Sequence, residues 1–152
     1  MIKLLFITFF STSILFVPEK KLETGIYYVK DSRESSTVQL EYKDYNNLIS
    51  ILNIDTVAVC EQKDFKKVEL DVSHYSGNTI LIELTKDGAK KFSEATEKSI
   101  GKSLAIIVNG EIVSAPYVNE KIPGGKLQIS GNFTLEQANR IKKELTQLSE
   151  TK

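Results

Sequence analysis

The pair Asn109-Gly110 lies between two short apolar runs, and this arrangement constrains the fold more than any other stretch of the chain. Residues 104–108 are apolar and rich in β-branched side chains, and residues 112–115 have the composition of a second strand. A two-residue turn of type I′ requires positive φ at both central positions, which asparagine and glycine adopt at low cost. The sequence therefore predicts a β-hairpin over residues 104–115.

Two helices are predicted around this hairpin. Residues 86–98 have an apolar face at helical spacing, made of Ala89, Phe92, Ala95 and Thr96, and Gly101 follows where a helix would end. Residues 135–148 have a second apolar stripe, made of Leu135, Ala138, Ile141, Leu145 and Leu148, and Thr134 and Gln137 have the spacing of a capping box. On the outer face of the first helix, the i, i+4 spacing of Asp87 and Lys91 predicts an exposed ion pair.

The N-terminal half has strand character. Residues 25–29 and 37–42 are predicted to form a hairpin around the polar turn at 31–36, and period-two alternation places Val38, Leu40 and Tyr42 on one face. Residues 45–54 fit either a short helix or an irregular connection. Further strands are predicted at 56–59, 67–74 and 79–84, with a turn or helical turn at 62–65. The fold class is α+β: an antiparallel sheet with two helices packed on one face, ferredoxin-like in general plan.

Four sequence segments occur in order and closely spaced: Glu83-Leu-Thr-Lys-Asp-Gly-Ala-Lys-Lys-Phe92, Gly101-Lys-Ser-Leu-Ala-Ile106, Ile112-Val-Ser-Ala-Pro116 and Gln128-Ile-Ser-Gly-Asn-Phe-Thr134. They resemble the head part of the first large periplasmic domain of the SecD and SecDF protein-export subunits. The resemblance is strong over residues 79–145 and weaker over 56–78. It implies a periplasmic arm of a proton-driven membrane pump that contacts emerging polypeptide.

The N-terminus and the resemblance together suggest three segments. Residues 4–17 carry no charge, follow Lys3, and have the length of a signal-peptide core rather than of a membrane span. Residues 1–17 are therefore predicted to be an export signal or a short N-terminal anchor, residues 18–55 a strand-rich extension, and residues 56–152 the SecD-head-like α+β domain. The protein is expected to be exported and periplasmic or envelope-associated, with membrane contact only through the N-terminal segment if that segment is retained.

Charge and reactive residues narrow the classes of function. Twenty Lys and Arg residues balance twenty Asp and Glu residues, so the net charge is zero. Only two of the twenty basic residues are arginines, which argues against a nucleic-acid partner. His74 is the only histidine and Cys60 the only cysteine, so neither metal ligands nor a nucleophile-base couple are evident. Cys60 follows an apolar run and is expected to be a buried, inert thiol. No catalytic, cofactor or metal site is predicted.

The expected function is a non-enzymatic binding module whose ligand is an extended polypeptide or another envelope protein. An antiparallel sheet can accept an added strand at an open edge, which suits an extended polypeptide. The candidate partner-binding residues are Tyr117, Ile122, Pro123, Gly124, Gly125 and Phe133. Ordinary edge packing and turn chemistry is the competing interpretation of these residues. The alternative functions are a docking module for a folded envelope partner and an envelope hydrolase.

Overall fold

The computed structural model describes residues 21–73 and 77–146, which form two antiparallel sheets and two helices. The strands are β1 (Gly25–Lys30), β2 (Thr37–Lys43), β3 (Ile49–Glu61), β4 (Phe65–Ser73), β5 (Gly77–Leu84), β6 (Leu104–Val108), β7 (Glu111–Ser114) and β8 (Lys126–Ser130). The helices are α1 (Lys86–Lys98) and α2 (Leu135–Thr146), and a 3₁₀ turn, η1 (Gln62–Asp64), separates β3 from β4. No helix among the described residues is long and apolar enough to span a membrane.

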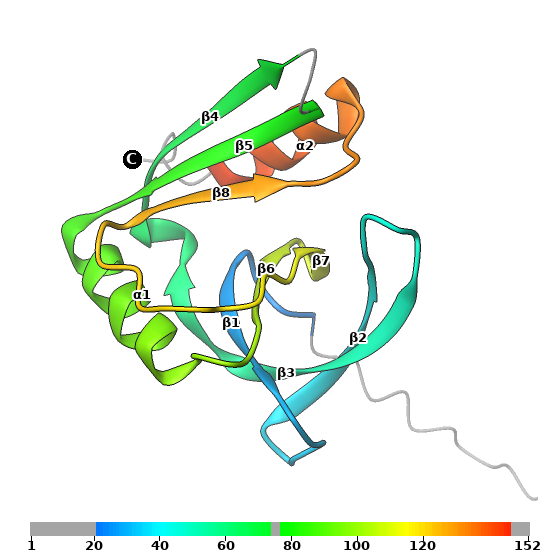
Figure 1. The fold of residues 1–152 in the computed structure, drawn as a ribbon, viewed down its shortest axis with the longest axis vertical. Helices are drawn as coiled ribbons and strands as arrows, with labels where there is room; N and C mark the ends of the chain where they lie inside the picture. Colours follow the sequence, from blue (N-terminus) through cyan, green and yellow to red (C-terminus); the bar gives the residue numbers. More distant parts are fainter. Residues whose placement is uncertain (1–20, 74–76, 147–152) are drawn as a thin grey trace, which may run out of the picture.

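The strands are divided between a five-stranded sheet with the order β2-β3-β1-β6-β7 and a three-stranded sheet with the order β4-β5-β8. The outer strands of the larger sheet, β2 and β7, contact each other, so this sheet curls toward closure. Figure 1 shows the smaller sheet above the larger one. The chain passes between the sheets three times: at η1, through α1, and in the connection from β7 to β8.

The inner strand β6 is buried on both faces, which explains its continuous apolar run. On one face Leu104, Ile106 and Val108 enter the main core, which lies between the two sheets. On the other face Ala105 and Ile107 join a second core, formed inside the curled sheet with Tyr27 and Ile54. The predicted turn is confirmed, because φ is 50° at Asn109 and 81° at Gly110.

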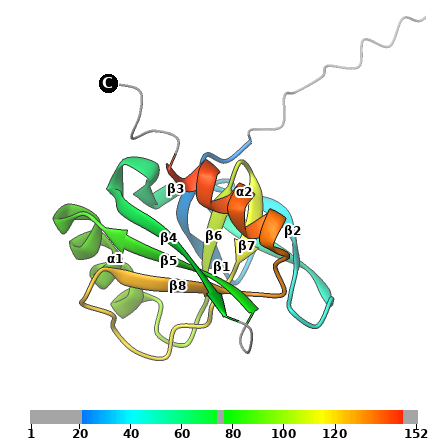
Figure 2. The same cartoon turned by 90° about the horizontal axis from the view of Figure 1, so that it is seen from above.

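Both helices bury one apolar face in the main core and lie toward opposite ends of the three-stranded sheet (Figures 1 and 2). The Oγ1 atom of Thr85 accepts a hydrogen bond of 3.1 Å from the Gly88 amide and caps α1. The predicted capping box of α2 is confirmed: the Gln137 amide donates to Thr134 Oγ1 at 3.1 Å, and the Thr134 amide donates to Gln137 Oε1 at 2.9 Å.

The pairing of the strands differs from the prediction in two ways. A single sheet was expected, but the strands form two. Residues 25–29 and 37–42 were expected to pair with each other, but β3 lies between β1 and β2 and pairs with both. Alternation of apolar residues locates a strand, but it carries no information about which strand lies beside it. The ferredoxin-like plan is not confirmed, whereas the α+β class is.

Residues 45–54 contain a turn and then the start of β3, whose thirteen residues run past position 56. The predicted boundary between residues 55 and 56 therefore falls within a continuous strand. The predicted pair of Asp87 with Lys91 is also not formed as expected, because Lys91 pairs with Asp64 on η1 instead. The N-terminal segment 1–17, His74 and Leu148 lie outside the described residues.

The turn of the β6–β7 hairpin gives the first testable prediction. Gly110 has φ of 81°, and a Cβ atom built on it would lie 2.6 Å from the side chain of Lys21. Gly110→Val should lower the free energy of unfolding by more than ~1 kcal/mol, because a β-branched residue is strained at positive φ. Gly110→Asn is the control and should lose less, since asparagine tolerates this conformation. Equal denaturation midpoints for all three proteins would show that the turn does not constrain the fold.

Candidate functional site

A groove of about 340 Å³ opens where the two sheets meet α1. Its floor is apolar and consists of residues from the main core, namely Ile26, Phe92, Leu104 and Ile106. Its rim is formed by the connection between β7 and β8 and by the first residues of β8. On this rim, Tyr117 is 61% exposed and Ile122 is 36% exposed. The floor side chains are each at most 5% exposed, so the accessible apolar surface of the groove belongs mainly to its rim.

The rim is held in place by backbone hydrogen bonds to the segment that follows α1. Val118 is buried; its amide donates to the Lys102 carbonyl at 2.8 Å, and its carbonyl accepts from the Gly101 amide at 2.9 Å. The Ile122 amide donates to Oγ1 of Thr96, a buried residue of α1, at 3.0 Å. Because these bonds use backbone atoms of the rim, the side chains of Tyr117 and Ile122 remain available at the groove.

Gly125 fixes the end of the rim against α1. Its carbonyl accepts a 2.8 Å hydrogen bond from the Leu84 amide, and its φ is 61°. A Cβ atom at this position would lie 2.4 Å from the Cβ atom of Ala89 on α1. At the neighbouring Gly124, a Cβ atom would meet nothing within 4 Å. The close approach of the rim to α1 thus requires glycine at 125 and not at 124.

The structure brings together some of the residues predicted from the sequence. Tyr117 and Ile122 line the groove, and Pro123 and Gly124 are exposed beside it, followed by the buried Gly125. Phe133 lies elsewhere: its ring packs against the main core, and its carbonyl accepts a 2.9 Å hydrogen bond from Asn78 Nδ2. The floor residues were not predicted from the sequence, since buried apolar positions do not reveal which of them border an opening.

The groove can bury an apolar side chain, and polar groups surround it. Glu120, Lys126 and Gln128 lie at its margin. Within residues 21–73 and 77–146, no three His, Cys, Asp or Glu side chains gather closely enough to hold a metal ion. The chemistry that this groove supports is apolar burial flanked by polar contacts.

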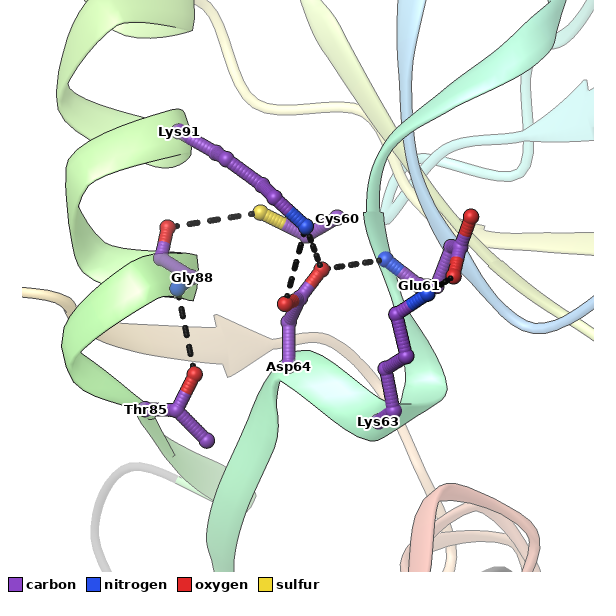
Figure 3. A network of polar contacts seen from close by, with 7 residues as sticks. All are labelled: Cys60, Glu61, Lys63, Asp64, Thr85, Gly88 and Lys91. Atoms are coloured by element: carbon purple, nitrogen blue, oxygen red, sulfur yellow. Dashed lines mark hydrogen bonds and ion pairs between the residues drawn. The ribbon is translucent and has the colours of Figure 1, made fainter.

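A second polar feature, the Asp64 network, lies at the corner between β3 and β4 (Figure 3). Asp64 is buried, and its carboxylate accepts hydrogen bonds from Lys91 Nζ at 2.8 and 3.0 Å and from the Glu61 amide at 3.0 Å. Its backbone carbonyl accepts a 2.8 Å bond from the Thr85 amide. The residue therefore joins η1 to the beginning and the middle of α1.

The Asp64 network has the properties of a structural junction. The side-chain hydrogen bond between Lys91 and Asp64 raises the pKa of Lys91 above its usual value. Burial raises the pKa of the Cys60 thiol to about 12, with a smaller contribution from the charge of Asp64. The thiol thus stays protonated and lies 3.6 Å from the Gly88 carbonyl, as expected for an inert buried cysteine. A nucleophile would need the opposite shift of its pKa.

The sequence and the fold were compared with known proteins. The family model described as "SecDF, P1 head subdomain" matches residues 38–147. A protein translocase subunit SecD from Sebaldella termitidis is 34% identical over 128 residues, which cover 81% of this chain and 30% of the relative. The SecD of Acidaminococcus fermentans is 29% identical over 118 residues, which cover 74% of this chain and 26% of the relative. The chain thus spans less than a third of the length of these relatives.

Two solved structures have a similar fold. One is described as a membrane component SecDF that enhances protein export; it superposes with a TM-score of 0.59 at 20% identity and covers 82% of this chain and 63% of the other. The other is SecDF in a super-membrane-facing form, with a TM-score of 0.58, 23% identity, and coverage of 80% of this chain and 18% of the other. Both support the α+β arrangement of the described residues.

The two adjacent glycines of the rim provide a matched pair of substitutions. Gly125→Ala should lower the free energy of unfolding by about 1–3 kcal/mol, because the added methyl group collides with Ala89 at a positive φ. Gly124→Ala should leave it within about 0.5 kcal/mol, because the space there is open. Urea denaturation of both variants tests this difference. A stable Gly125→Ala variant would mean that the rim is not tightly seated on α1.

Proposed function

Because the chain belongs to the SecDF P1 head subdomain family, we propose that it is a non-enzymatic module that contacts extended polypeptide in the cell envelope. The observation that carries this proposal is the apolar groove beside α1, whose rim holds Tyr117 and Ile122 at the surface. The relatives are named as subunits of a protein translocase, and extended polypeptide is the ligand that we propose here. A groove open to apolar side chains suits such a ligand, because an unfolded chain exposes the side chains that a folded protein buries.

The size of the groove sets the expected strength of binding. Burying one Leu, Val or Phe side chain contributes about 1.5–3 kcal/mol, and association costs several kcal/mol of lost freedom. A single occupied groove therefore gives weak binding that depends little on sequence. Such binding suits a surface that must release its ligand, and it requires no bond-making chemistry at the groove.

A second candidate function is docking to a folded envelope protein. The observation that favours it is an exposed apolar surface at the tip of the β2–β3 hairpin, the hairpin-tip patch. Its members, each more than half exposed, are Tyr45, Leu48, Ile49 and Ile51. Large exposed apolar side chains gathered at one hairpin tip are typical of a protein-protein contact. The patch is separate from the residues that line the groove.

The envelope location is part of the proposal. The relatives bear the names of protein-translocase subunits, and one matched structure is described as a membrane component. We propose that residues 1–17 direct export or serve as an anchor. Polypeptide would then meet the described domain on the outer side of the cytoplasmic membrane.

Binding to an unfolded polypeptide tests the proposal. A labelled polypeptide kept unfolded by reduction of its disulfides, and the same polypeptide in its folded form, are titrated with the protein while fluorescence anisotropy is followed. The unfolded form should bind at least ten times more tightly. Ile122→Asn should weaken this binding about 3- to 10-fold, because it removes about 1 kcal/mol of apolar burial at the rim.

Ile49→Asn is the matched control, since Ile49 is also an exposed isoleucine but lies in the hairpin-tip patch. It should leave binding of the unfolded polypeptide unchanged. Equal affinity for folded and unfolded forms would contradict the proposal. Loss of binding in Ile49→Asn alone would move the contact from the groove to the hairpin-tip patch.

A further inference from the structure

The strand β8 is an open edge of the three-stranded sheet. It pairs with β5 in a continuous antiparallel register from Thr79–Ser130 to Glu83–Lys126. On its other side, no strand and no backbone hydrogen bond from any described residue occupies the edge. Half of its backbone N–H and C=O groups therefore point away from the sheet, because successive residues of an edge strand present these groups alternately inward and outward.

The other sheet edges are less suited to pairing with a ligand at the groove. The two outer strands of the larger sheet, β2 and β7, contact each other as that sheet curls. The edge strand β4 is at the opposite side of its sheet from β8, contributes no residue to the groove, and has a register shift between Phe65 and Lys67. Such an irregularity at the end of a strand hinders regular addition of another strand. Among the described strands, β8 is thus the edge best suited to pairing.

Two hollows flank β8, one on each face of its sheet. The groove lies on the inner face, where Leu127 packs against the main core and lines the groove together with Ile122 and Phe92. A shallower hollow of about 320 Å³ lies on the outer face, where Lys126 and Gln128 are exposed. Its other lining residues are mostly charged, namely Lys67, Glu69 and Glu83, around Leu81. One strand thus separates an apolar hollow from a polar one.

We propose that extended polypeptide binds by adding as a fourth strand to the free edge of β8. This inference rests on the proposed function and specifies how the ligand is held. The ligand backbone satisfies the outward-pointing N–H and C=O groups of β8, and such bonds are formed by any sequence except at proline. The strand order of the sheet becomes β4-β5-β8-ligand.

This geometry imposes a pattern on the ligand. Successive side chains of a strand point to opposite faces, so alternate residues of the added strand enter the inner groove and the outer hollow. The inner set meets Leu127, Ile122 and Phe92 and should be apolar. The outer set meets Lys126, Gln128 and their charged neighbours and should be polar. A segment of about five residues matches β8, whose pairing with β5 spans five positions.

Peptides with altered backbones test strand addition. The probe is a fluorescein-labelled nine-residue peptide in which Leu or Val alternates with Gln or Ser. Two derivatives carry N-methyl groups on alternate backbone amides, either on the odd or on the even residues. Because only one set of amides faces β8, one derivative should bind at least ten times more weakly than the parent, and the other should bind within threefold of it.

A peptide of the same composition with its apolar residues grouped together is the control for the pattern, and it should bind at least fivefold more weakly than the alternating peptide. If both N-methylated derivatives bind like the parent, or both lose affinity equally, strand addition is wrong while polypeptide binding in the groove stands. If neither the alternating peptide nor the unfolded polypeptide binds, the proposed function fails as well.

Discussion

The buried carboxylate of Asp64 holds the corner on which the rest of the structure depends. Only the three residues of η1 separate β3, a strand of the five-stranded sheet, from β4, a strand of the three-stranded sheet. At this corner Asp64 accepts hydrogen bonds from Glu61 and Lys91, and its carbonyl accepts from Thr85. Gly88 lets α1 approach closely, because a Cβ atom there would lie 2.8 Å from the Asp64 carbonyl oxygen. Burying a carboxylate is costly unless it is paired, so the geometry of these partners is strongly specified.

The position of α1 at this corner determines where the proposed binding surface lies. Once α1 is fixed against η1, its Phe92 and Thr96 line the groove, and the connection between β7 and β8 is hydrogen-bonded to Thr96. The same connection ends at Gly125, directly before β8, so the groove and the open edge are neighbours. Apolar burial and backbone pairing can thus act on one extended ligand.

Local patterns in the sequence predicted most helices, strands and turns. They did not predict which strands pair with each other across the fold. Asn109-Gly110 predicted its turn and Thr134 with Gln137 predicted its capping box, because each depends on residues a few positions apart. The division into two sheets depends instead on which strands meet across the fold, and alternation is the same for any partner. Lys91 was assigned to Asp87 on its own helix, since a partner on η1 leaves no mark on helical spacing. For the same reason the sequence suggested Tyr117 and Ile122 at the rim but not the floor beneath them.

Amide hydrogen exchange with and without an unfolded polypeptide is the most direct test that the ligand lies along β8 and the groove. The account predicts slower exchange on addition of polypeptide at residues 126–130, where outward amides gain partners, and at residues 116–122 on the rim. Exchange in the hairpin-tip patch, residues 45–51, should be unchanged. Protection confined to residues 45–51, or no protection at residues 126–130 under conditions where the polypeptide is bound, would contradict the account.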